Sequence, residues 1–435
     1  METTQATTLE RTLHLSIALP EVEAEVDKRL KKLSKTLSIQ GFRPGKAPMR
    51  IVMQQYGGQV HQEALGEMAE QCFTQAVTEE RLRVAGFPRF EPKPDASQGA
   101  FEFTAHFEVF PEVVLGDVTQ QRVERTLTEV TEADVDRTVD ILRRQRIRYE
   151  TVARAAQQED QVVLDYAGFL EDQHFEGGTA QNQRLVLGKG RFLAAFEAAL
   201  EGMQAGESKS FPLTFPEDYQ APALAGKTVR FEVTVHEVLL GVLPDLDAGF
   251  VQTIGVSSGE LTDLRAELRT NLERETRTRT KALLKERVMN ALLETTPLDL
   301  PKVLVQQEIE QLRQGAMAEL RQRQGGQSDI QLPDSFFEAQ ARRRVSLGII
   351  LAEVIKREGL QAAPDQVRAT VEDMAQAYEH PEEFVRWYFQ QPERLEEVRS
   401  LVLEDAVVDW VCQRAQMVDV PTPFEQLAGQ TGGGA

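Results

Sequence analysis

The sequence predicts a multidomain α+β protein in which several modules follow one another along the chain. The first part mixes strand-like and helix-like periodicity, the middle part is rich in Gly, Phe and short strand-like runs, and the last part has helical periodicity throughout. A chain of 435 residues can form about two to four domains. We expect an N-terminal α/β domain, a helical connector, a strand-rich domain with one short helix and an all-α domain, over residues 1–117, 118–150, 151–243 and 244–435.

The N-terminal part is interpreted as a strand, two helices and a second strand. Alternating apolar residues predict a strand with one buried face, at Leu13, Leu15, Ile17 and Leu19. Pro20 suits the first turn of a helix, whose apolar stripe would be Val22, Val26, Leu30, Leu33 and Leu37. This helix is expected to end near Gly41, and a second helix is expected from Pro48 to Val84. Strand alternation returns over 101–109.

The connector and the middle domain differ in composition. Residues 118–150 are charged and favour helix, whereas residues 151–243 contain many Gly and clustered Phe. Three strands and one short helix are expected, over 162–170, 210–215, 228–239 and 192–200 respectively.

From residue 244 the chain is predicted to be helical. Ser257 and Glu260 have capping-box spacing ahead of an apolar stripe, and Pro297 and Pro301 mark a break before the next helix. Later helices are expected through 305–320, 334–358, 364–378 and 382–416. The Gly-rich tail over 428–435 is expected to be disordered.

Composition and charge exclude several classes of function. A net charge of −20 argues against broad nucleic-acid binding, so any RNA contact must come from a local basic patch. Neither the two cysteines nor the six histidines have metal-ligand spacing, and GKG at 188–190 is not a P-loop, so we expect no metal and no cofactor. With neither a secretory signal pattern nor a run of about 18 apolar residues, a cytoplasmic protein without a membrane partner is expected.

One segment of the first domain has a charge opposite to that of the whole chain. Residues 28–50 contain eight Lys or Arg and no Asp or Glu. The run ends in GFRPGKAP at 41–48, where two Gly and two Pro shape a loop. This loop would project Phe42, Arg43 and Lys46. The basic residues can contact phosphates, and Phe42 can enter an apolar crevice or stack.

The loop closely resembles the ribosome-binding signature of the trigger factor family, a GFRxGKxP pattern at the tip of an αα hairpin in the N-terminal domain. Every fixed position is matched, by Gly41, Phe42, Arg43, Gly45, Lys46 and Pro48, with Pro44 at the variable position after Arg43. The resemblance implies that these residues contact a ribosomal protein and rRNA beside the exit tunnel.

Residues 160–240 are similar to FKBP-type peptidyl-prolyl isomerases. The similarity runs through DYAG, HFEGG, LVLGKG, FLAAF, FPEDY and TVRF, which begin at residues 165, 174, 185, 192, 215 and 228. It implies an FKBP-like half-barrel with a short helix and an apolar bowl for proline, lined by Tyr166, Phe175, Phe192, Leu193, Phe196, Tyr219 and Phe231, with Glu176 at the acidic rim. Ala194 and Ala195 stand where the family usually has Pro-Gly or Arg-Gly.

An apolar bowl suits the isomerisation of X-Pro peptide bonds. Twisting the amide must overcome a barrier of about 18–20 kcal/mol, and no nucleophile or metal is required. Because the twisted amide loses resonance, its carbonyl is less polar, and an apolar cavity can favour it over the planar form. A single donor such as the Tyr219 hydroxyl can orient the carbonyl.

The C-terminal half resembles the body of trigger factors. Residues 244–256 are similar to the family's junction after the isomerase domain, and residues 300–308 to the Pro-led helix that follows. The resemblance implies an all-α chaperone domain with helical arms and dispersed apolar patches that capture unfolded segments weakly. We interpret the aromatic run Trp387, Tyr388 and Phe389 as core packing, with contact to client chains as the alternative.

These similarities favour an ATP-independent, ribosome-associated chaperone for unfolded nascent polypeptides, with isomerase activity as an accessory. A weak homodimer away from the ribosome is left open. One alternative is a free-standing prolyl isomerase whose helical domains tether substrates, which leaves the loop at 41–48 unexplained. Another is a helical scaffold or assembly protein, which uses neither motif.

Overall fold

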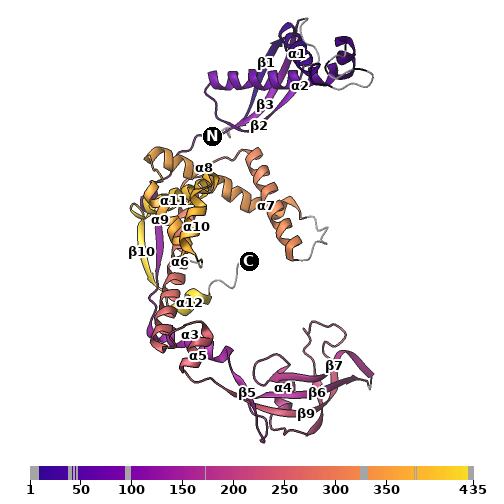
Figure 1. Ribbon diagram of the computed structural model, residues 1–435, viewed down its shortest axis with the longest axis vertical. Coiled ribbons are helices and arrows are strands. Elements are labelled where there is room, and N and C mark those ends of the chain that lie inside the picture. The colour runs from indigo at the N-terminus through magenta and orange to yellow at the C-terminus, as the bar shows by residue number, and fades with distance from the viewer. Residues whose placement is uncertain are drawn as a thin grey trace, which may run out of the picture. The chain divides into compact units, whose positions relative to one another are not determined.

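The computed structural model describes residues 9–37, 42, 45, 48–93, 99–171, 173–323, 332–376, 378 and 380–429. Within these ranges, Glu176 is described by its backbone alone. The chain divides into two compact units, one of Met1–Thr126 with Ala282–Val420 and one of Leu127–Lys281 with Pro421–Ala435. The predicted multidomain α+β fold class is confirmed, with a mixed N-terminal region, a strand-rich region and a helical C-terminal region (Figure 1). The domain boundaries at 117, 150 and 243 stay predictions. None of the described helices combines the length and apolar character needed to cross a membrane.

The N-terminal region is a three-stranded antiparallel sheet, in the order β1-β3-β2, that packs against two helices. Its elements are β1 (Glu10–Ala18), α1 (Leu19–Leu33), α2 (Met49–Glu79), β2 (Val84–Pro92) and β3 (Ala100–Val109). The predicted apolar stripe of α1 is buried, since Val22, Val26 and Leu30 join a core with Val52 and Phe103. This packing fixes the direction in which both helices run toward the loop at 41–48.

Helix α1 is shorter than predicted. It ends at Leu33 rather than near Gly41, because the next residues form a turn. The Ser34 hydroxyl donates to the carbonyl of Lys31 at 2.9 Å, and the Thr36 hydroxyl donates to that of Leu33 at 3.1 Å. Such side-chain bonds to the backbone compete with helix continuation.

The second helix ends at Glu79, before the predicted Val84, and after a turn the unpredicted strand β2 follows. This strand was not predicted because it contains Gly86 and Pro88, and both residue types are rare in regular strands. They are tolerated because β2 is an edge strand whose pairing with β3 shifts between Ala85 and Arg89. A Cβ on Gly86 would lie 2.2 Å from Val303 Cγ1 on α7 (Lys302–Arg323), so only Gly permits that approach.

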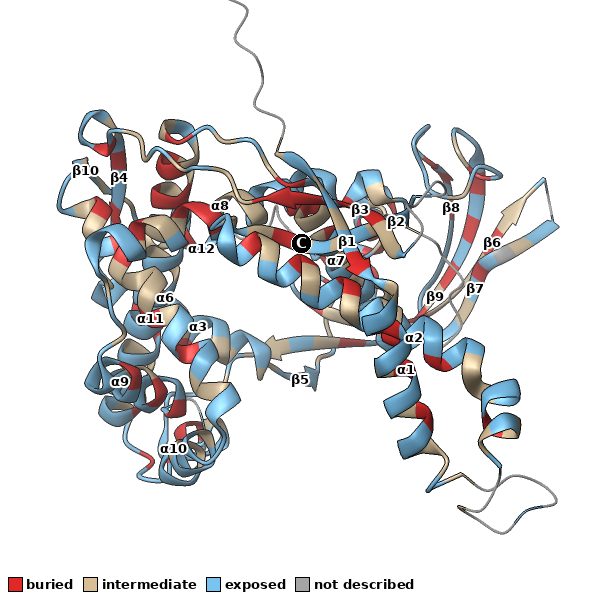
Figure 2. Ribbon diagram, turned by 90° about the horizontal axis from the view of Figure 1, so that it is seen from above, coloured by how far each residue is buried: buried red, intermediate tan, exposed pale blue. Residues whose placement is uncertain are grey.

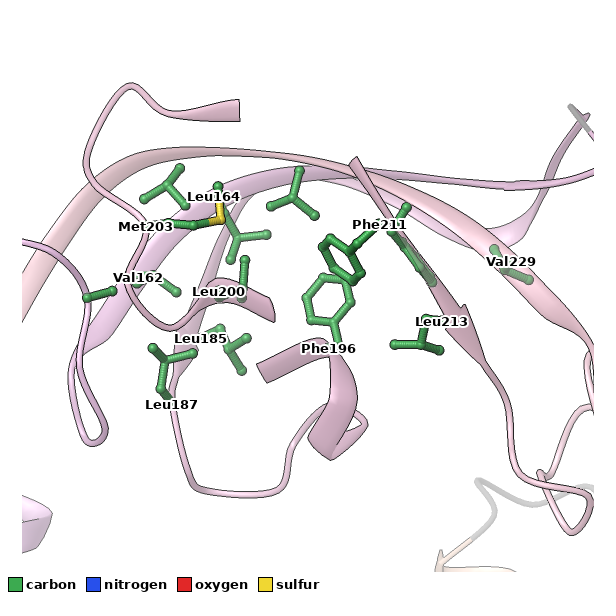
Figure 3. Packing of buried hydrophobic residues seen from close by; sticks show 14 of the residues in the cluster. Val162, Leu164, Leu185, Leu187, Phe196, Leu200, Met203, Phe211, Leu213 and Val229 are labelled. Atoms are coloured by element: carbon green, nitrogen blue, oxygen red, sulfur yellow. The ribbon is translucent and has the colours of Figure 1, made fainter. Parts of the chain in front are cut away.

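The strand-rich region is a five-stranded antiparallel sheet, in the order β5-β9-β6-β7 with β8 paired to β9. Its elements are β5 (Arg148–Thr151), β6 (Gln161–Leu170), β7 (Gln173–Val186), α4 (Ala194–Leu200), β8 (Ser208–Thr214) and β9 (Thr228–Val242). Buried and exposed residues alternate along β9 (Figure 2). Helix α4 supplies Phe196 and Leu200 to the core beneath the sheet, where Phe196 faces Phe211 (Figure 3). Strand β7 was not predicted, because its polar, Gly-containing sequence suits an edge strand without an apolar period.

Residues 118–150 are only partly helical, in contrast to our expectation. They contain η1 (Val118–Gln120), β4 (Arg122–Leu127), α3 (Glu132–Gln145) and β5. Helix α3 starts at a capping box formed by Thr131 and Asp134. Val118 and Val123 are buried in a core with residues of the C-terminal helices.

The C-terminal region consists of α5 (Ala248–Ile254), α6 (Leu261–Thr295), α7, η2 (Asp334–Phe336), α8 (Glu338–Glu358), α9 (Pro364–Ala375), α10 (Pro381–Phe389), α11 (Pro392–Cys412), β10 (Gln416–Pro421) and α12 (Phe424–Gly429). Pro297 and Pro301 separate α6 from α7 as predicted. The segment predicted as helix over 382–416 is divided by Pro392, and the unpredicted β10 pairs with β4. Of the tail, residues 430–435 lie outside the described chain, and Ala428 and Gly429 belong to α12.

Candidate functional site

Aromatic side chains from separate segments converge on the inner face of the strand-rich sheet. Tyr166 comes from β6, Phe231 from β9, Phe196 from α4 and Phe192 from the loop before α4. The Tyr166 ring centroid lies 5.7 Å from that of Phe192 and 5.8 Å from that of Phe196. The Phe196 and Phe231 centroids are 5.2 Å apart. All three pairs meet edge to face, and these distances are typical of packed aromatic pairs.

The aromatic group forms a bowl with a buried floor and an accessible wall. Phe196 and Phe231 are only 2% and 6% exposed and form the floor. The wall consists of half-buried residues, Tyr166, Phe175, Phe192 and Leu193, which pack against the same core. The structure therefore brings together the apolar residues that the sequence predicted, and the wall side chains stay partly exposed to solvent.

Two further rings belong to the bowl and were missing from the predicted site. Phe211 on β8 lies 5.6 Å from Phe196 between ring centroids. Phe215, just after β8, lies 6.4 Å from Phe175. Phe211, Leu213 and Phe215 alternate along the chain and are all buried. That period of two was the signal that could have placed both rings on the inner face.

Tyr219 stands at the edge of the bowl. Its side chain is 37% exposed, and its ring lies 4.6 Å from that of Phe215 between centroids. Burial raises the pKa of the Tyr166 phenol, and the nearby Tyr219 raises it further. Within the described residues, neither phenol oxygen has a hydrogen-bond partner. The Tyr166 phenol thus stays protonated near neutral pH, and both hydroxyls are available to a ligand.

Two glycines allow the Phe175 ring to lie close against the sheet. A Cβ on Gly168 would lie 2.6 Å from Phe175 Cε1 and 2.9 Å from Phe231 Cε1. A Cβ on Gly178 would lie 2.7 Å from Phe175 Cζ. Real Cβ atoms do not approach carbon this closely, so any other residue would displace the rings. The glycines of DYAG and HFEGG therefore shape the wall. The side chain of Glu176, predicted at the rim, lies outside the described part of the chain.

A buried carboxylate holds the loop that carries the wall residue Phe192. Glu197 is 5% exposed, and its carboxylate accepts the backbone N–H of Gly188 at 2.7 Å and of Phe192 at 3.2 Å. Two backbone donors satisfy this charge in the first turn of α4. Sequence reasoning missed Glu197. Ala194 and Ala195 are exposed at the start of α4, so the departure from the family pattern does not remove an apolar floor residue.

The loop at 41–48 is described only at Phe42, Gly45 and Pro48; Gly41, Arg43, Pro44 and Lys46 lie outside the described residues. Phe42 is 38% exposed. The Gly45 N–H donates to the Leu37 carbonyl at 3.1 Å, and Gly45 has a φ of +75°. A Cβ there would lie 2.7 Å from the Lys35 carbonyl oxygen, so the closed loop requires Gly. The Pro48 carbonyl then accepts the Ile51 N–H at the start of α2.

Two of the eight basic residues in 28–50 are neutralised within the protein. Lys28 donates to Glu25, and Arg29 donates to both oxygens of Glu67 at 3.0 and 2.6 Å. Four others are exposed and have no partner in the described ranges: Lys31, Lys32, Lys35 and Arg50. The positive surface is thus smaller than the sequence count suggests, and it borders the loop.

The aromatic run on α10 is more exposed than predicted. Trp387 and Phe389 are 47% and 42% exposed, and Tyr378 before α10 is 56% exposed. Of the three residues of the run, Tyr388 packs, together with Phe384, against the core between α9 and α11. The Arg394 guanidinium carbon lies 3.2 Å from the Trp387 ring centroid. The interpretation as core packing is therefore wrong for Trp387 and Phe389, which face solvent because α10 is a single two-turn helix at the surface.

Other concave or polar regions offer less specific chemistry. A shallow hollow of about 910 Å³ lies over the outer face of the strand-rich sheet and is lined by Asp165, Ser208, Glu232, Thr234 and their neighbours. No Phe side chain lines it, in contrast to the bowl. Throughout the described part of the chain, no group of three or more His, Cys, Asp or Glu is placed to hold a metal ion.

Comparisons with known proteins match the N-terminal, strand-rich and C-terminal regions. A family profile described as "Bacterial trigger factor protein (TF)" matches residues 1–142, and its C-terminal counterpart matches 260–413. A profile described as "FKBP-type peptidyl-prolyl cis-trans isomerase" matches 152–236. The trigger factor of Dechloromonas aromatica is 48% identical over 98% of this chain and 99% of its own length. That of Aromatoleum aromaticum is 47% identical over 99% of both. A solved trigger factor chaperone aligns at a TM-score of 0.47 and 17% identity, over 95% of this chain and 98% of that one.

Proposed function

Because the chain belongs to the trigger factor family and contains an FKBP-type peptidyl-prolyl isomerase domain, we propose that it is a ribosome-associated, ATP-independent chaperone that isomerises X-Pro bonds in nascent chains. This function rests on two features of one chain. One is the apolar aromatic bowl, and the other is a loop that exposes Phe42 beside basic residues without a partner among the described residues. Work at the ribosome would place the protein in the cytoplasm.

The bowl would bind the proline ring of an X-Pro segment. Phe196 and Phe231 form the apolar floor, and the half-buried wall contacts the ring edges. The amide carbonyl would lie toward the mouth, within reach of the Tyr219 hydroxyl. In our proposal, Tyr166, Phe175, Phe192 and Leu193 form the wall, and Glu176 lies at the rim. None of these groups transfers a proton to the substrate or forms a covalent bond with it.

Catalysis would come from binding the twisted amide better than the planar one. The planar carbonyl is polar and loses hydration in an apolar bowl, whereas the twisted carbonyl has less resonance and loses less. Each 1.4 kcal/mol of this difference is worth about tenfold in rate, against a barrier of about 18–20 kcal/mol. A dry, shaped cavity is therefore sufficient for this reaction, which needs no cofactor.

The loop at 41–48 would dock on the ribosome. Arg43 and Lys46 would contact rRNA phosphates together with the exposed basic residues of α1 and its following turn, and Phe42 would enter an apolar crevice of a ribosomal protein. Such contacts release counterions from the RNA, so affinity should fall as salt rises. The net charge of −20 limits RNA binding elsewhere on the chain.

Client capture would use exposed apolar surface on the helical region. Tyr378, Trp387 and Phe389 expose about half of their side chains around α10. Large exposed aromatic groups offer weak, sequence-tolerant contacts to unfolded segments. We therefore propose this surface as one client contact. Such contacts do not depend on nucleotide hydrolysis.

Co-sedimentation with ribosomes tests the docking role. The triple variant Phe42→Ala, Arg43→Ala, Lys46→Ala should no longer pellet with ribosomes, while its isomerase activity stays at the wild-type level. The double variant Arg343→Ala, Arg357→Ala is a matched control, because both residues are exposed on α8 and have no partner in the described chain. If the triple variant pellets as well as wild type, the docking proposal is wrong.

Aggregation assays test the chaperone role. The purified protein should suppress aggregation of a chemically denatured protein equally with and without ATP. Replacing Trp387 and Phe389 together by Ser should weaken this suppression without changing ribosome binding. A requirement for ATP would contradict the proposed mode of action, and full suppression by the double Ser variant would exclude α10 as a client contact.

A further inference from the structure

Strand β6 carries Tyr166, and its pairing with both neighbouring strands is irregular just before that residue. On the β7 side, Leu164 pairs with Gln183, whereas Tyr166 pairs with Ala180. Two steps along β6 therefore match three steps along β7, and β7 has one extra residue opposite Asp165. This is the pattern of a β-bulge.

The β9 side has a bulge next to the first. Val163 pairs with Glu237, but the following residue, Leu164, pairs with Val235. The residue passed over on β9 is His236. The short segment of β6 before Tyr166 thus lies between two bulges on opposite sides. From Leu164 to Phe169 the pairing with β9 is regular, whereas the pairing with β7 is interrupted at Asp165.

One carboxylate contacts the bulged residues of both neighbouring strands. Asp165 Oδ1 accepts the backbone N–H of Asn182 at 2.7 Å, and Oδ2 lies 2.9 Å from His236 Nε2. Asn182 has a φ of +51°, in the left-handed region that Asn tolerates better than most non-Gly residues. The Asn182 N–H and, to a lesser extent, His236 keep the pKa of Asp165 below its usual value, so the carboxylate is ionised near neutral pH.

Asp165 and Tyr166 lie on opposite faces of the sheet because neighbouring side chains in a strand alternate. Asp165 lines the hollow over the outer face, and its side chain is 37% exposed. Tyr166 faces the bowl, where its ring contacts those of Phe192, Phe196 and Phe231. A slip of one residue along β6 would turn Tyr166 to the outer face and remove one wall of the bowl.

We propose that Asp165 is a positioning residue of the isomerase site, whose carboxylate ties together the bulges at Asn182 and His236 and thereby fixes the Tyr166 ring in the wall of the bowl. This role rests on the proposed isomerase function. Asp165 itself does not touch the substrate, because it lies on the far face of the sheet. Its effect on activity must therefore pass through Tyr166.

Single substitutions in the full-length protein test the role of the carboxylate. Asp165→Ala should lower kcat/KM for a prolyl peptide about three- to tenfold, because the wall is no longer held in place. Asp165→Asn should retain most of the activity, since its amide oxygen can accept from Asn182 and its NH2 can donate to a neutral His236. Glu237→Gln, a neighbouring exposed position, is the charge-matched control and should have wild-type activity.

A double-substitution cycle shows whether the effect passes through Tyr166. In a Tyr166→Leu background, Asp165→Ala should cause little further loss, because the ring that Asp165 positions is already absent. The NMR resonances of the Tyr166 ring should also shift in Asp165→Ala and remain close to wild type in Asp165→Asn. Equal losses from Asp165→Ala in both backgrounds, or an active Asp165→Ala with an unshifted Tyr166 ring, would overturn the proposal. A wild-type protein without isomerase activity would instead contradict the proposed function, and the ring shifts would still report on positioning.

Discussion

The aromatic bowl and the basic loop illustrate two different ways of building a binding site. The floor of the bowl is part of a hydrophobic core, with Phe231 only 6% exposed. The loop exposes 38% of Phe42 and is closed by a backbone hydrogen bond from Gly45 to Leu37. A site that acts through shape shares its residues with the core, so damage to it should lower stability and activity together. A site that acts through charge and one exposed ring can lose its function while the fold persists.

Phe231→Ala should have the largest effect, on both stability and activity. Removing a buried Phe ring costs about 3–5 kcal/mol of unfolding free energy. The void at the floor would also admit water where the twisted amide needs an apolar surface, so kcat/KM for a prolyl peptide should fall about a hundredfold. Thermal unfolding and a peptide isomerisation assay measure the two effects.

Phe73→Ala provides the control for this loss of stability. Phe73 is 5% exposed, close to the 6% of Phe231, but it packs with Phe107 in a separate core of the N-terminal region. This variant should be destabilised by a similar amount and keep its isomerase activity. A folded Phe231→Ala protein with undiminished activity would show that the bowl is assigned to the wrong residues.

Gly168→Ala should damage the bowl by overfilling it rather than by opening it. The new methyl group would lie 2.6 Å from the Phe175 ring, so the ring must move. Overpacking of this kind costs about 1–3 kcal/mol, and the displaced wall should lower kcat/KM about 10- to 100-fold. Gly315→Ala on α7 is the control, because a Cβ there meets no atom within 4 Å. Wild-type activity in Gly168→Ala would mean that Phe175 does not contact the substrate.

Gly45→Ala should affect the loop alone. Its left-handed φ costs a residue with a Cβ about 1–2 kcal/mol, and the Lys35 carbonyl blocks the methyl group. The loop would relax to another conformation, and docking would then have to restore the original one. The free energy spent on this change should weaken ribosome binding about 5- to 30-fold. Because the loop can relax, stability should fall by no more than about 1–2 kcal/mol, and isomerase activity should stay at the wild-type level. Co-sedimentation that is unchanged would show that docking does not need the closed loop.

The sequence predicted most of the bowl because its residues lie in recognisable motifs, but it did not predict the groups that hold those residues in place. Glu197 and Asp165 act through backbone N–H groups that are brought near them only by the fold. Gly168 and Gly178 matter because of one ring that packs on them. Such roles depend on contacts across the sheet, which no local period in the sequence reports.

Secondary structure was likewise predicted where its signal is local and missed where it depends on distant contacts. The buried stripe of α1 was predicted because its period is local and strong. Strands β2, β7 and β10 were missed because edge strands carry Gly, Pro and polar residues and depend on a distant partner for their hydrogen bonds. The expected charge of 28–50 was overstated because Glu67, far along the chain, neutralises Arg29.

Tyr219→Phe should have the smallest effect, and it separates orientation of the substrate from the shape of the bowl. Tyr219 is 37% exposed and its hydroxyl has no partner among the residues described, so stability should not change. If the hydroxyl donates to the substrate carbonyl, its loss removes a hydrogen bond worth about 0.5–1.5 kcal/mol. We therefore expect kcat/KM to fall about two- to tenfold, with Tyr149→Phe on β5 unchanged as the control. Full activity in Tyr219→Phe would mean that another donor orients the carbonyl, and the Tyr166 hydroxyl in the wall would be the next to test.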